Sequence, residues 1–381
     1  MSGMRPVRLM QVDSYYSAYL RQFYGERPEL RDAPYTRQTE AILDDGYAAI
    51  HRVSLHLDGL GYEVRHVAAN AVSAQGRWAA ENGVPIEVRS EADALNVLRR
   101  QIDAFQPDVL YTTDTMLLDG NFLRSLKRRP PLVMGWHASP IPPGLEWSGY
   151  DVILTALDRL RSVATERLGA RAAEHFVPGF PTGILTGLPE PAPRQDVVFV
   201  GQYTQGQHRQ RGLYLEAIAE AAAESRLTCA FHLSGGVASL PESLGPWARP
   251  PVYGRSMHMA LRSGRMAFDA RSEMTYVDPV LNQTIDLAGR QTANMRIFEC
   301  TGGGSFLITE RFDNLGDWFD EGREIETFGA PEELVDKIRF FAAHERARET
   351  IARAGQRRCL TEHSMERRAA DFDAIIRKYL A

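Results

Sequence analysis

One acid stands inside an otherwise apolar stretch of the chain. It is Glu299, which lies between Phe298 and Cys300. The turn-prone segment just before it contains the small polar residues Thr292 and Asn294, and such a segment can leave the first amides of a helix free to face an anion. A carboxylate one or two turns into that helix could reach ribose hydroxyls. These residue types therefore favour a site for the diphosphate and ribose of a sugar nucleotide.

The helix around Glu299 has ends that the sequence marks clearly. Its turn-prone start includes Gly289, and residues 302–304, all of them glycine, follow it. We interpret the three glycines as a helix stop before a strand at residues 305–309. Since neither a GxGxxG pattern nor a Walker pattern occurs in the chain, a glycine-rich phosphate loop is not expected.

Strand and helix signals alternate along the chain, which is the pattern of a parallel sheet covered on both faces. In the first half, the apolar spacing predicts an amphipathic helix that runs through Ile42 and Leu57 and ends at Gly61. The longer segment before it, residues 13–35, holds tyrosines and arginines that could form part of a binding platform or a packed Ω-like loop. The strands expected in this half are residues 7–12, 62–67, 108–112, 132–136, 152–155 and 175–177.

A proline-rich connector at residues 188–195 interrupts this alternation, which restarts with a strand at residues 197–200. The sequence therefore predicts the α/β class, with two doubly wound Rossmann-like domains that face each other across a cleft. The expected parts are an N-terminal domain at 1–187, a linker at 188–195, a C-terminal domain at 196–360 and a C-terminal helix at 361–381. That last helix could return to the N-terminal domain.

Composition narrows the class of protein. With 381 residues, 44% of them hydrophobic and 24% charged, the chain is long enough for two globular domains. A net charge of −5 argues against a nucleic-acid partner. No window approaches the ~18 uninterrupted apolar residues of a membrane span, so we expect no integral membrane segment and a cytoplasmic location. The three cysteines, Cys229, Cys300 and Cys359, lack metal-ligand spacing, and Asp371 and Asp373 lie on an amphipathic helix, so no metal site is expected.

Four fragments of the second half, taken in order, resemble the GT-B glycosyltransferases of group 1 and, within them, the CgeB-like (spore maturation protein-like) transferases. They are DVVFVG at 196–201, VYG at 252–254, NMRIFE at 294–299 and EIETFGAPEEL at 324–334. The resemblance implies a metal-independent glycosyltransferase without a cofactor, whose donor is a nucleotide diphosphate sugar of UDP or GDP type. The acceptor, a glycan, a protein or a small molecule, is expected to bind mainly to the N-terminal domain.

The resemblance assigns the donor to residues near Glu299. In retaining group 1 transferases an acid that touches the donor sugar precedes the ribose-binding acid by eight positions, but here that position holds Gln291. An amide can bond to sugar hydroxyls, although it offers no negative charge to a developing oxocarbenium ion. Arg296 lies three residues before Glu299, so it could contact the diphosphate or form an ion pair within the helix.

Further donor contacts are expected near strand ends of the second domain. Arg209 or Arg211, near the start of a helix, could neutralise the leaving diphosphate, and only one of them is needed. Gly235, Tyr253 and Gly254 occupy positions where the base could stack or take backbone hydrogen bonds, although Tyr253 is better explained as a core residue. The expected donor-binding set is Glu299, Arg296, Asn294, Thr292, Gln291, Arg209, Arg211, Gly235, Tyr253 and Gly254.

Three polar residues at strand ends of the first domain are candidates for the base that takes the acceptor proton. His137 ranks first because a nearly all-apolar strand precedes it and a loop follows, and Asp13 and Asp114 come next. His137 could equally be a hydrogen-bonded structural histidine, and either aspartate could cap the segment after it. Two alternatives to a transferase stay open: a sugar-nucleotide epimerase or hydrolase of the same fold, and a catalytically silent sugar-nucleotide-binding protein, which the missing acid at Gln291 would permit.

Overall fold

The computed structural model describes residues 5–190, 192, 194–204, 208–235 and 240–380, and the chain divides into two units. Unit 1 contains Met1–Val177, Val277–Gln283 and Arg368–Ala381, and unit 2 contains Pro178–Tyr276 and Thr284–Arg367. Residues 178–187, which we expected in the N-terminal domain, are thus part of unit 2. Pro191 and Pro193 of the expected linker lie outside the described residues.

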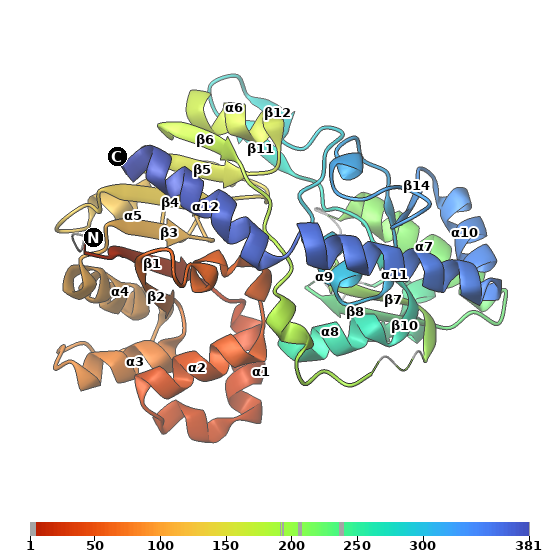
Figure 1. Cartoon of the computed structure of the whole chain (residues 1–381), viewed down its shortest axis with the longest axis horizontal. Coiled ribbons are helices and arrows are strands. Elements are labelled where there is room, and N and C mark those ends of the chain that lie inside the picture. The colour runs from red at the N-terminus through yellow and green to blue at the C-terminus, as the bar shows by residue number, and fades with distance from the viewer. Residues whose placement is uncertain (1–4, 191, 193, 205–207, 236–239, 381) are drawn as a thin grey trace. The chain divides into compact units, whose positions relative to one another are not determined.

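Unit 1 is built on a six-stranded parallel sheet in the order β2-β1-β3-β4-β5-β6 (Figure 1). Three of its four inner strands, β3, β4 and β5, are buried along their whole length, as expected of a parallel sheet with both faces covered. The strands are β1 (Val7–Asp13), β2 (Tyr62–Ala68), β3 (Val109–Thr112), β4 (Leu132–Trp136), β5 (Val152–Thr155) and β6 (Ala172–His175).

Hydrogen bonds from capping side chains define the starts of some helices in unit 1. For example, α4 begins at a capping box, in which the Ser90 hydroxyl accepts a hydrogen bond from the Asp93 amide and the Asp93 carboxylate accepts one from the Ser90 amide. The α-helices are α1 (Ser17–Glu26), α2 (Tyr35–Asp45), α3 (Val72–Glu81), α4 (Glu91–Phe105), α5 (Gly120–Arg124), α6 (Asp158–Glu166) and α12 (Met365–Leu380). The 3-10 helices are η1 (Pro28–Asp32), η2 (Ala49–His51) and η3 (Val53–His56).

The C-terminal helix α12 packs on the sheet of unit 1. The ring of Phe372 lies 4.8 Å from that of Tyr111 on β3 and 5.7 Å from that of Phe176, measured between centroids. The Tyr62 hydroxyl at the start of β2 donates a 2.6 Å hydrogen bond to the Asp373 carboxylate. The last turns of the chain are therefore held by the first sheet.

The predicted helix ending at Gly61 is wrong. Helix α2 starts earlier, at Tyr35, and stops at Gly46, whose φ of 78° is left-handed. Ala48 is also left-handed, so the chain continues as η2 and η3 rather than as one helix. Apolar spacing alone misleads here, because a left-handed glycine ends a helix whatever pattern follows it.

Unit 2 is built on a second six-stranded sheet, in the order β14-β13-β10-β7-β8-β9, whose paired strands run parallel. The strands are β7 (Gln195–Gln202), β8 (Cys229–Ser234), β9 (Ala248–Arg249), β10 (Gly264–Asp269), β13 (Phe306–Glu310) and β14 (Glu326–Phe328). A separate two-stranded sheet consists of β11 (Thr275–Asp278) and β12 (Gln283–Asp286).

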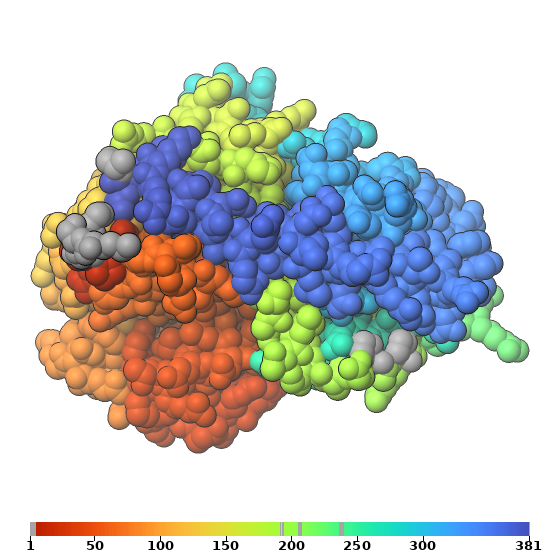
Figure 2. All heavy atoms as spheres, viewed as in Figure 1, coloured from red at the N-terminus to blue at the C-terminus, as the bar shows by residue number. Residues whose placement is uncertain are grey.

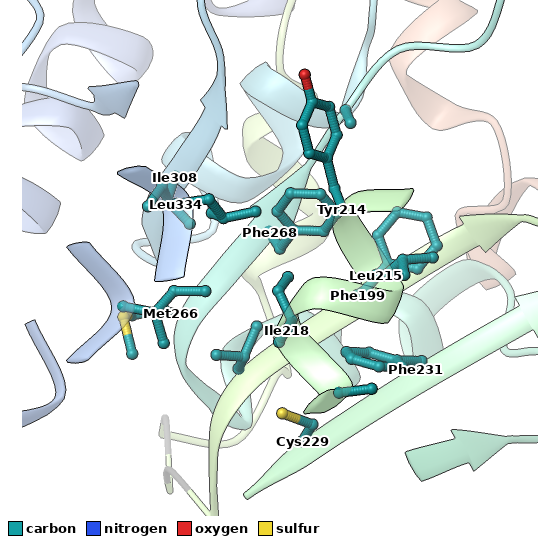
Figure 3. Packing of buried hydrophobic residues seen from close by; sticks show 14 of the residues in the cluster. Phe199, Tyr214, Leu215, Ile218, Cys229, Phe231, Met266, Phe268, Ile308 and Leu334 are labelled. Atoms are coloured by element: carbon teal, nitrogen blue, oxygen red, sulfur yellow. The ribbon is translucent and has the colours of Figure 1, made fainter. Parts of the chain in front are cut away.

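Alternate residues of these strands form the core on one face of the sheet, against helices α7 and α10 (Figure 3). Phe199 lies 5.8 Å from Phe268, and Phe268 stacks on Phe328 at 5.9 Å. The α-helices of unit 2 are α7 (Arg209–Ala223), α8 (Gly254–Arg262), α9 (Arg296–Gly302), α10 (Pro331–Ala343) and α11 (Glu345–Glu362). Its 3-10 helices are η4 (Thr182–Leu185), η6 (Glu242–Trp247) and η7 (Leu315–Asp317).

Strand order reverses once in each sheet, between β1 and β3 in unit 1 and between β7 and β10 in unit 2. Ligands of open α/β sheets bind beyond the carboxyl ends of the strands at such reversals. We therefore expect ligands to bind beyond the carboxyl ends of β1 and β3 in unit 1 and of β7 and β10 in unit 2. Among the described helices, none is both long and apolar enough to cross a membrane.

Candidate functional site

Arg211 bridges the two strands at the reversal point of unit 2. Its Nε donates to the carbonyl oxygen of Ala270 at 2.8 Å, and its Nη1 donates to that of Gln202 at 2.9 Å. The guanidinium lies 5.6 Å from the ring centre of Phe199, and Arg211 is buried. The arginine expected to face a leaving diphosphate thus joins the ends of β7 and β10, while Arg209, at the start of α7, is exposed.

A buried acid, Asp269, ends strand β10 beside this arginine. Its two carboxylate oxygens accept hydrogen bonds from Asn294 Nδ2 at 2.7 Å and from Thr309 Oγ1 at 3.3 Å. Burial raises the pKa of Asp269 above its ordinary value, against the opposing charges of Arg211 and Arg296. Asp269 was not among the residues expected from the sequence, although it follows an apolar strand directly, as Asp13 does in the first domain.

Glu299 lies in the middle of α9 and pairs with Arg296. Arg296 Nη1 is 2.6 Å from Glu299 Oε2, and the two side chains are 17% and 9% exposed. The ion pair that the three-residue spacing allows is therefore formed. His258 of α8 lies close enough to interact electrostatically with both charges. Burial lowers the pKa of His258 to about 4; the negative charge of Glu299 acts to raise this pKa, and the positive charge of Arg296 acts to lower it. The site thus combines a carboxylate, a guanidinium and a neutral imidazole.

The first amides of α9 are not free, which corrects the expectation for this segment: those of Arg296 and Ile297 donate to the side-chain and main-chain oxygens of Asn294, each at 3.4 Å. The amides before the helix are bonded as well. The Thr292 amide donates to Asn314 Oδ1 at 2.9 Å, and the Asn294 amide donates to Thr292 Oγ1 at 3.1 Å. Asn314 Nδ2 in turn donates to the Thr292 carbonyl at 2.8 Å. Because α9 has only seven residues and these side chains already bond its preceding amides, an anion here would have to meet cationic side chains.

Arg271 supplies a third cation at this edge, after Arg211 and Arg296. Its Nη1 donates to the Gln291 carbonyl at 2.7 Å, and its guanidinium lies 4.9 Å from the ring centre of Phe312. Glu310, at the end of the neighbouring strand β13, is half-buried, and burial raises its pKa while Arg271 opposes that rise. Neither Arg271 nor Glu310 was selected from the sequence, and their proximity could not be predicted, because it depends on the pairing of β10 with β13.

The positions expected beside the base follow β8 and begin α8. Gly235 has a φ of 75°, and a Cβ there would lie 3.2 Å from Thr204 Cγ2. Gly254, the first residue of α8, has a φ of 54°, and Tyr253 before it is buried. Gly236, the other glycine of this turn, lies outside the described residues.

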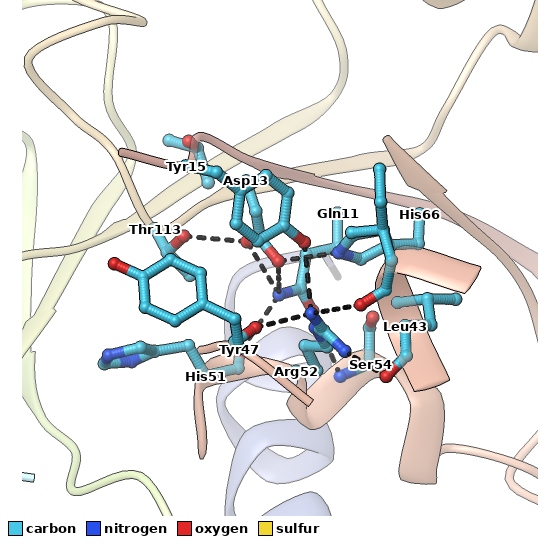
Figure 4. A network of polar contacts seen from close by, with 12 residues as sticks. Gln11, Asp13, Tyr15, Leu43, Tyr47, His51, Arg52, Ser54, His66 and Thr113 are labelled. Atoms are coloured by element: carbon cyan, nitrogen blue, oxygen red, sulfur yellow. Dashed lines mark hydrogen bonds and ion pairs between the residues drawn. The ribbon is translucent and has the colours of Figure 1, made fainter. Parts of the chain in front are cut away.

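Asp13, at the reversal point of unit 1, forms a buried pair with His66 (Figure 4). His66 Nε2 is 2.6 Å from Asp13 Oδ2, and Asp13 Oδ1 accepts hydrogen bonds from Gln11 Nε2 and Thr113 Oγ1 at 3.0 and 2.7 Å. Burial alone would raise the pKa of Asp13, but His66 and the hydrogen bonds lower it to about 2. Sequence reasoning missed His66, since it lies within β2 rather than at its end.

Asp114 and His137 lie along the same edge and are both held by neighbours. Asp114 Oδ1 accepts from the amides of residues 116 and 117, and the Ser14 hydroxyl donates to its other oxygen, so Asp114 caps a turn. His137 Nε2 is 2.9 Å from the Ser139 carbonyl and must donate, which leaves Nδ1 to accept from Thr115 Oγ1 at 2.8 Å. Burial lowers the pKa of His137 to about 4. These contacts fit a structural histidine.

The aromatic segment at 13–35 is mostly packed inside unit 1. Tyr15, Tyr19, Phe23 and Tyr24 are buried, whereas Tyr16 is half exposed. A cavity of about 210 Å³ lies beside α1, lined by residues that include Ser17, Leu20, Arg21, Tyr24, Arg31, Asn70 and Glu91.

In the described part of the chain, no three His, Cys, Asp or Glu side chains are placed to hold a metal ion.

A family model described as Glycosyl transferase-like matches residues 196–374, which begin in β7 and reach into α12. No curated protein matches the chain in sequence. The matched part includes the whole edge built around Glu299, Arg271 and Asp269. It is therefore a glycosyltransferase domain.

Solved structures resemble the chain over its whole length. AviGT4, a glycosyltransferase involved in avilamycin A biosynthesis, shares 15% identity at a TM-score of 0.59, with 98% of each chain covered. A glycosyltransferase from Rickettsia africae ESF-5 shares 9% identity at 0.56, over 99% of each chain. A protein from Listeria monocytogenes provisionally named UDP-N-acetylglucosamine 2-epimerase shares 14% identity at 0.50, over 99% of this chain and 97% of that one. At these identities the likeness shows the fold alone, which is the GT-B fold. The glycosyltransferase assignment comes from the matched domain at residues 196–374.

Proposed function

We propose that this GT-B glycosyltransferase transfers a sugar from a nucleotide diphosphate donor of UDP or GDP type to an acceptor hydroxyl. The observation that supports it most is the grouping of Glu299, Arg296, Arg271 and Asp269 at the carboxyl edge of the unit 2 sheet, inside the matched domain. At such an edge Glu299 would accept hydrogen bonds from ribose hydroxyls. Arg271 and Arg296 would face the diphosphate.

The chemistry of transfer explains why cations are needed there. The bond between the anomeric carbon and the diphosphate oxygen breaks, the acceptor oxygen bonds to that carbon, and the nucleoside diphosphate leaves with the electron pair. Guanidinium groups stabilise the charge that develops on the leaving oxygens. We propose that Arg271 and Arg296 do this without a metal ion, while Arg211 keeps the ends of β7 and β10 in place. Gln291 would bond to donor hydroxyls.

The acceptor would bind to unit 1, and its hydroxyl proton would pass to a base there. Of Asp13, Asp114 and His137, only Asp114 is half-buried, whereas the other two are almost wholly buried. We therefore propose Asp114 as the base, and we assign Asp13 and His137 a structural role at the carboxyl ends of the strands. The cavity beside α1 is the proposed place for part of the acceptor, which would be a glycan, a protein or a small molecule.

Two finer assignments rest on the sequence. The fragments at 196–201, 252–254, 294–299 and 324–334 support a CgeB-like transferase. Three free, buried cysteines fit a reducing compartment and support a cytoplasmic location. The acidic net charge supports a small-molecule donor rather than a nucleic acid as partner.

The experiment that tests the function is a binding and turnover screen. Thermal shift and calorimetry with uridine, guanosine, adenosine and thymidine diphosphates and their sugars, without and then with magnesium, would identify the base, since ligands of the native state raise its Tm. Mass spectrometry and NMR of the product then separate sugar transfer or hydrolysis from epimerisation, the reaction named for the Listeria protein. Epimerised donor without transfer would favour that second function, and no binding to any nucleotide would refute the proposal.

A further inference from the structure

A cavity of about 440 Å³ lies at the opposite edge of the unit 2 sheet, where β10 and β13 begin at Gly264 and Phe306. The proposed donor edge lies at the other ends of the same strands, at Asp269 and Glu310. Five residue steps separate the two ends of β10, which at ~3.3 Å per residue places the cavity about 16 Å from the donor edge. The first turns of α11, which lies on the visible face of unit 2 in Figure 2, form another wall.

Positive charge dominates the lining of this cavity. Four arginines and two glutamates line it, and the carboxylate of Asp196 pairs with one of the arginines, Arg265, at 3.1 Å, so one positive charge is in excess. They are Arg262, Arg265, Arg348 and Arg353, with Glu345 and Glu349. Such an excess inside a concave wall favours an anionic ligand, because the low-dielectric walls concentrate the field of the four cations.

The arginines are only partly neutralised by the protein. Arg348 is 5% exposed; its Nη1 donates to the carbonyl oxygen of Phe341 at 2.5 Å, whereas its Nη2 stays 3.6 Å from Glu345 Oε1, beyond an ordinary hydrogen bond. Burial, followed by repulsion from Arg265, lowers the pKa of Arg348. The Nε of Arg262 is buried and has no hydrogen-bond partner among the residues that the structure describes. A bound anion would supply part of the missing negative charge.

We propose that this cavity binds the phosphate group of a small phosphorylated molecule. A phosphate monoester carries a charge of about −1.5 to −2 near neutral pH, so it would neutralise the positive excess and compete with the glutamates for the arginines. Guanidinium forks donate paired hydrogen bonds to phosphate oxygens, and a cluster of arginines around one pocket suits that geometry. The site is separate from the donor edge, so ligand binding there does not depend on the proposed transfer reaction.

Calorimetric titration with inorganic phosphate at low salt tests this site through two exposed residues. The side chains of Arg353 and Glu349 are 71% and 49% exposed and pair at 2.9 Å, so changing either should leave the fold intact. Arg353→Gln should weaken phosphate binding about three- to tenfold, because one charge-assisted contact is lost. Glu349→Gln should tighten it by about the same factor, since a repelling charge is removed and Arg353 is released.

Arg357→Gln is the matched control, because Arg357 is an exposed arginine of the same helix that does not line the cavity. Its phosphate affinity should stay within about twofold of the unmodified protein. No phosphate binding at all, or equal affinity in all three variants, would overturn the proposal. Binding that is lost in Arg271→Gln but insensitive to residues 349 and 353 would place the phosphate at the donor edge and would also overturn it.

Discussion

Replacing Glu299 by glutamine tests the donor edge with the smallest change in shape. The carboxylate is 9% exposed and lies 2.6 Å from Arg296, in the segment that we assign to the ribose. Glu299→Gln keeps one oxygen acceptor but removes the charge that strengthens hydrogen bonds from ribose hydroxyls. A hydrogen bond to a charged group contributes about 1.5–3 kcal/mol, so donor affinity should fall about ten- to a hundredfold.

Glu299→Gln also breaks the ion pair with Arg296, and the resulting loss of stability can be measured separately from the loss of donor affinity. Because the Arg296 side chain is still 17% exposed, solvent compensates part of the lost attraction, and unit 2 should lose about 1–2 kcal/mol. Glu326 offers a matched control: it pairs with Lys337 at 2.9 Å, and their side chains are 11% and 26% exposed. Glu326 lies on the outer strand β14, opposite Ile308, and is not assigned to the donor.

The assay is calorimetric titration of both variants with the nucleoside diphosphate that binds the unmodified protein, together with thermal unfolding. We expect a comparable loss of Tm in Glu299→Gln and Glu326→Gln, but a loss of affinity only in Glu299→Gln. Unchanged affinity in Glu299→Gln would refute the assignment of Glu299. An equal loss of affinity in both variants would show that the effect comes from weakened folding of unit 2.

Three further predictions concern other parts of the chain. The pKa of Asp13 is about 2, below its ordinary 3.8, because His66 and hydrogen bonds outweigh burial. The ionised carboxylate should therefore stabilise the folded state by about 2 kcal/mol above pH ~4, and this contribution should be lost as the pH falls towards 2. Asp13→Asn should remove this acid dependence in urea unfolding, and an unchanged acid limb would contradict it. Gly355→Ala should lower the Tm although alanine favours helix, since its Cβ would lie 2.2 Å from the Glu324 carbonyl oxygen; a higher Tm would count against this packing. Asp114→Asn should reduce transfer at least ~10-fold with donor affinity unchanged, and a wild-type rate would exclude Asp114 as the base.

The sequence predicts the elements of this fold better than their contacts. The ranges expected for β4 and β5 match the structure to the residue, because apolar runs mark them. Helix α2 was misplaced, since the left-handed Gly46 ends it before the apolar pattern does. Short elements such as β9 and β14 were missed, because two or three residues carry no periodic signal.

The candidate site depends more on tertiary contacts. The pair formed by Arg296 and Glu299 follows from their spacing, and the sequence analysis allowed for it. The bridging role of Arg211 could not be predicted, because its acceptors are carbonyls at the ends of two strands that are 68 residues apart, at Gln202 and Ala270. Asp269 and Glu310 could have been selected, since each is an acid that ends an apolar strand.

The most direct test of the central claim is a crystal structure of the chain with the nucleoside diphosphate selected by the binding screen. We expect the ribose hydroxyls within hydrogen-bond reach of Glu299 and the diphosphate beside Arg271, at the carboxyl ends of β7 and β10. A nucleotide bound elsewhere on the chain, with Glu299 still paired only to Arg296, would contradict it.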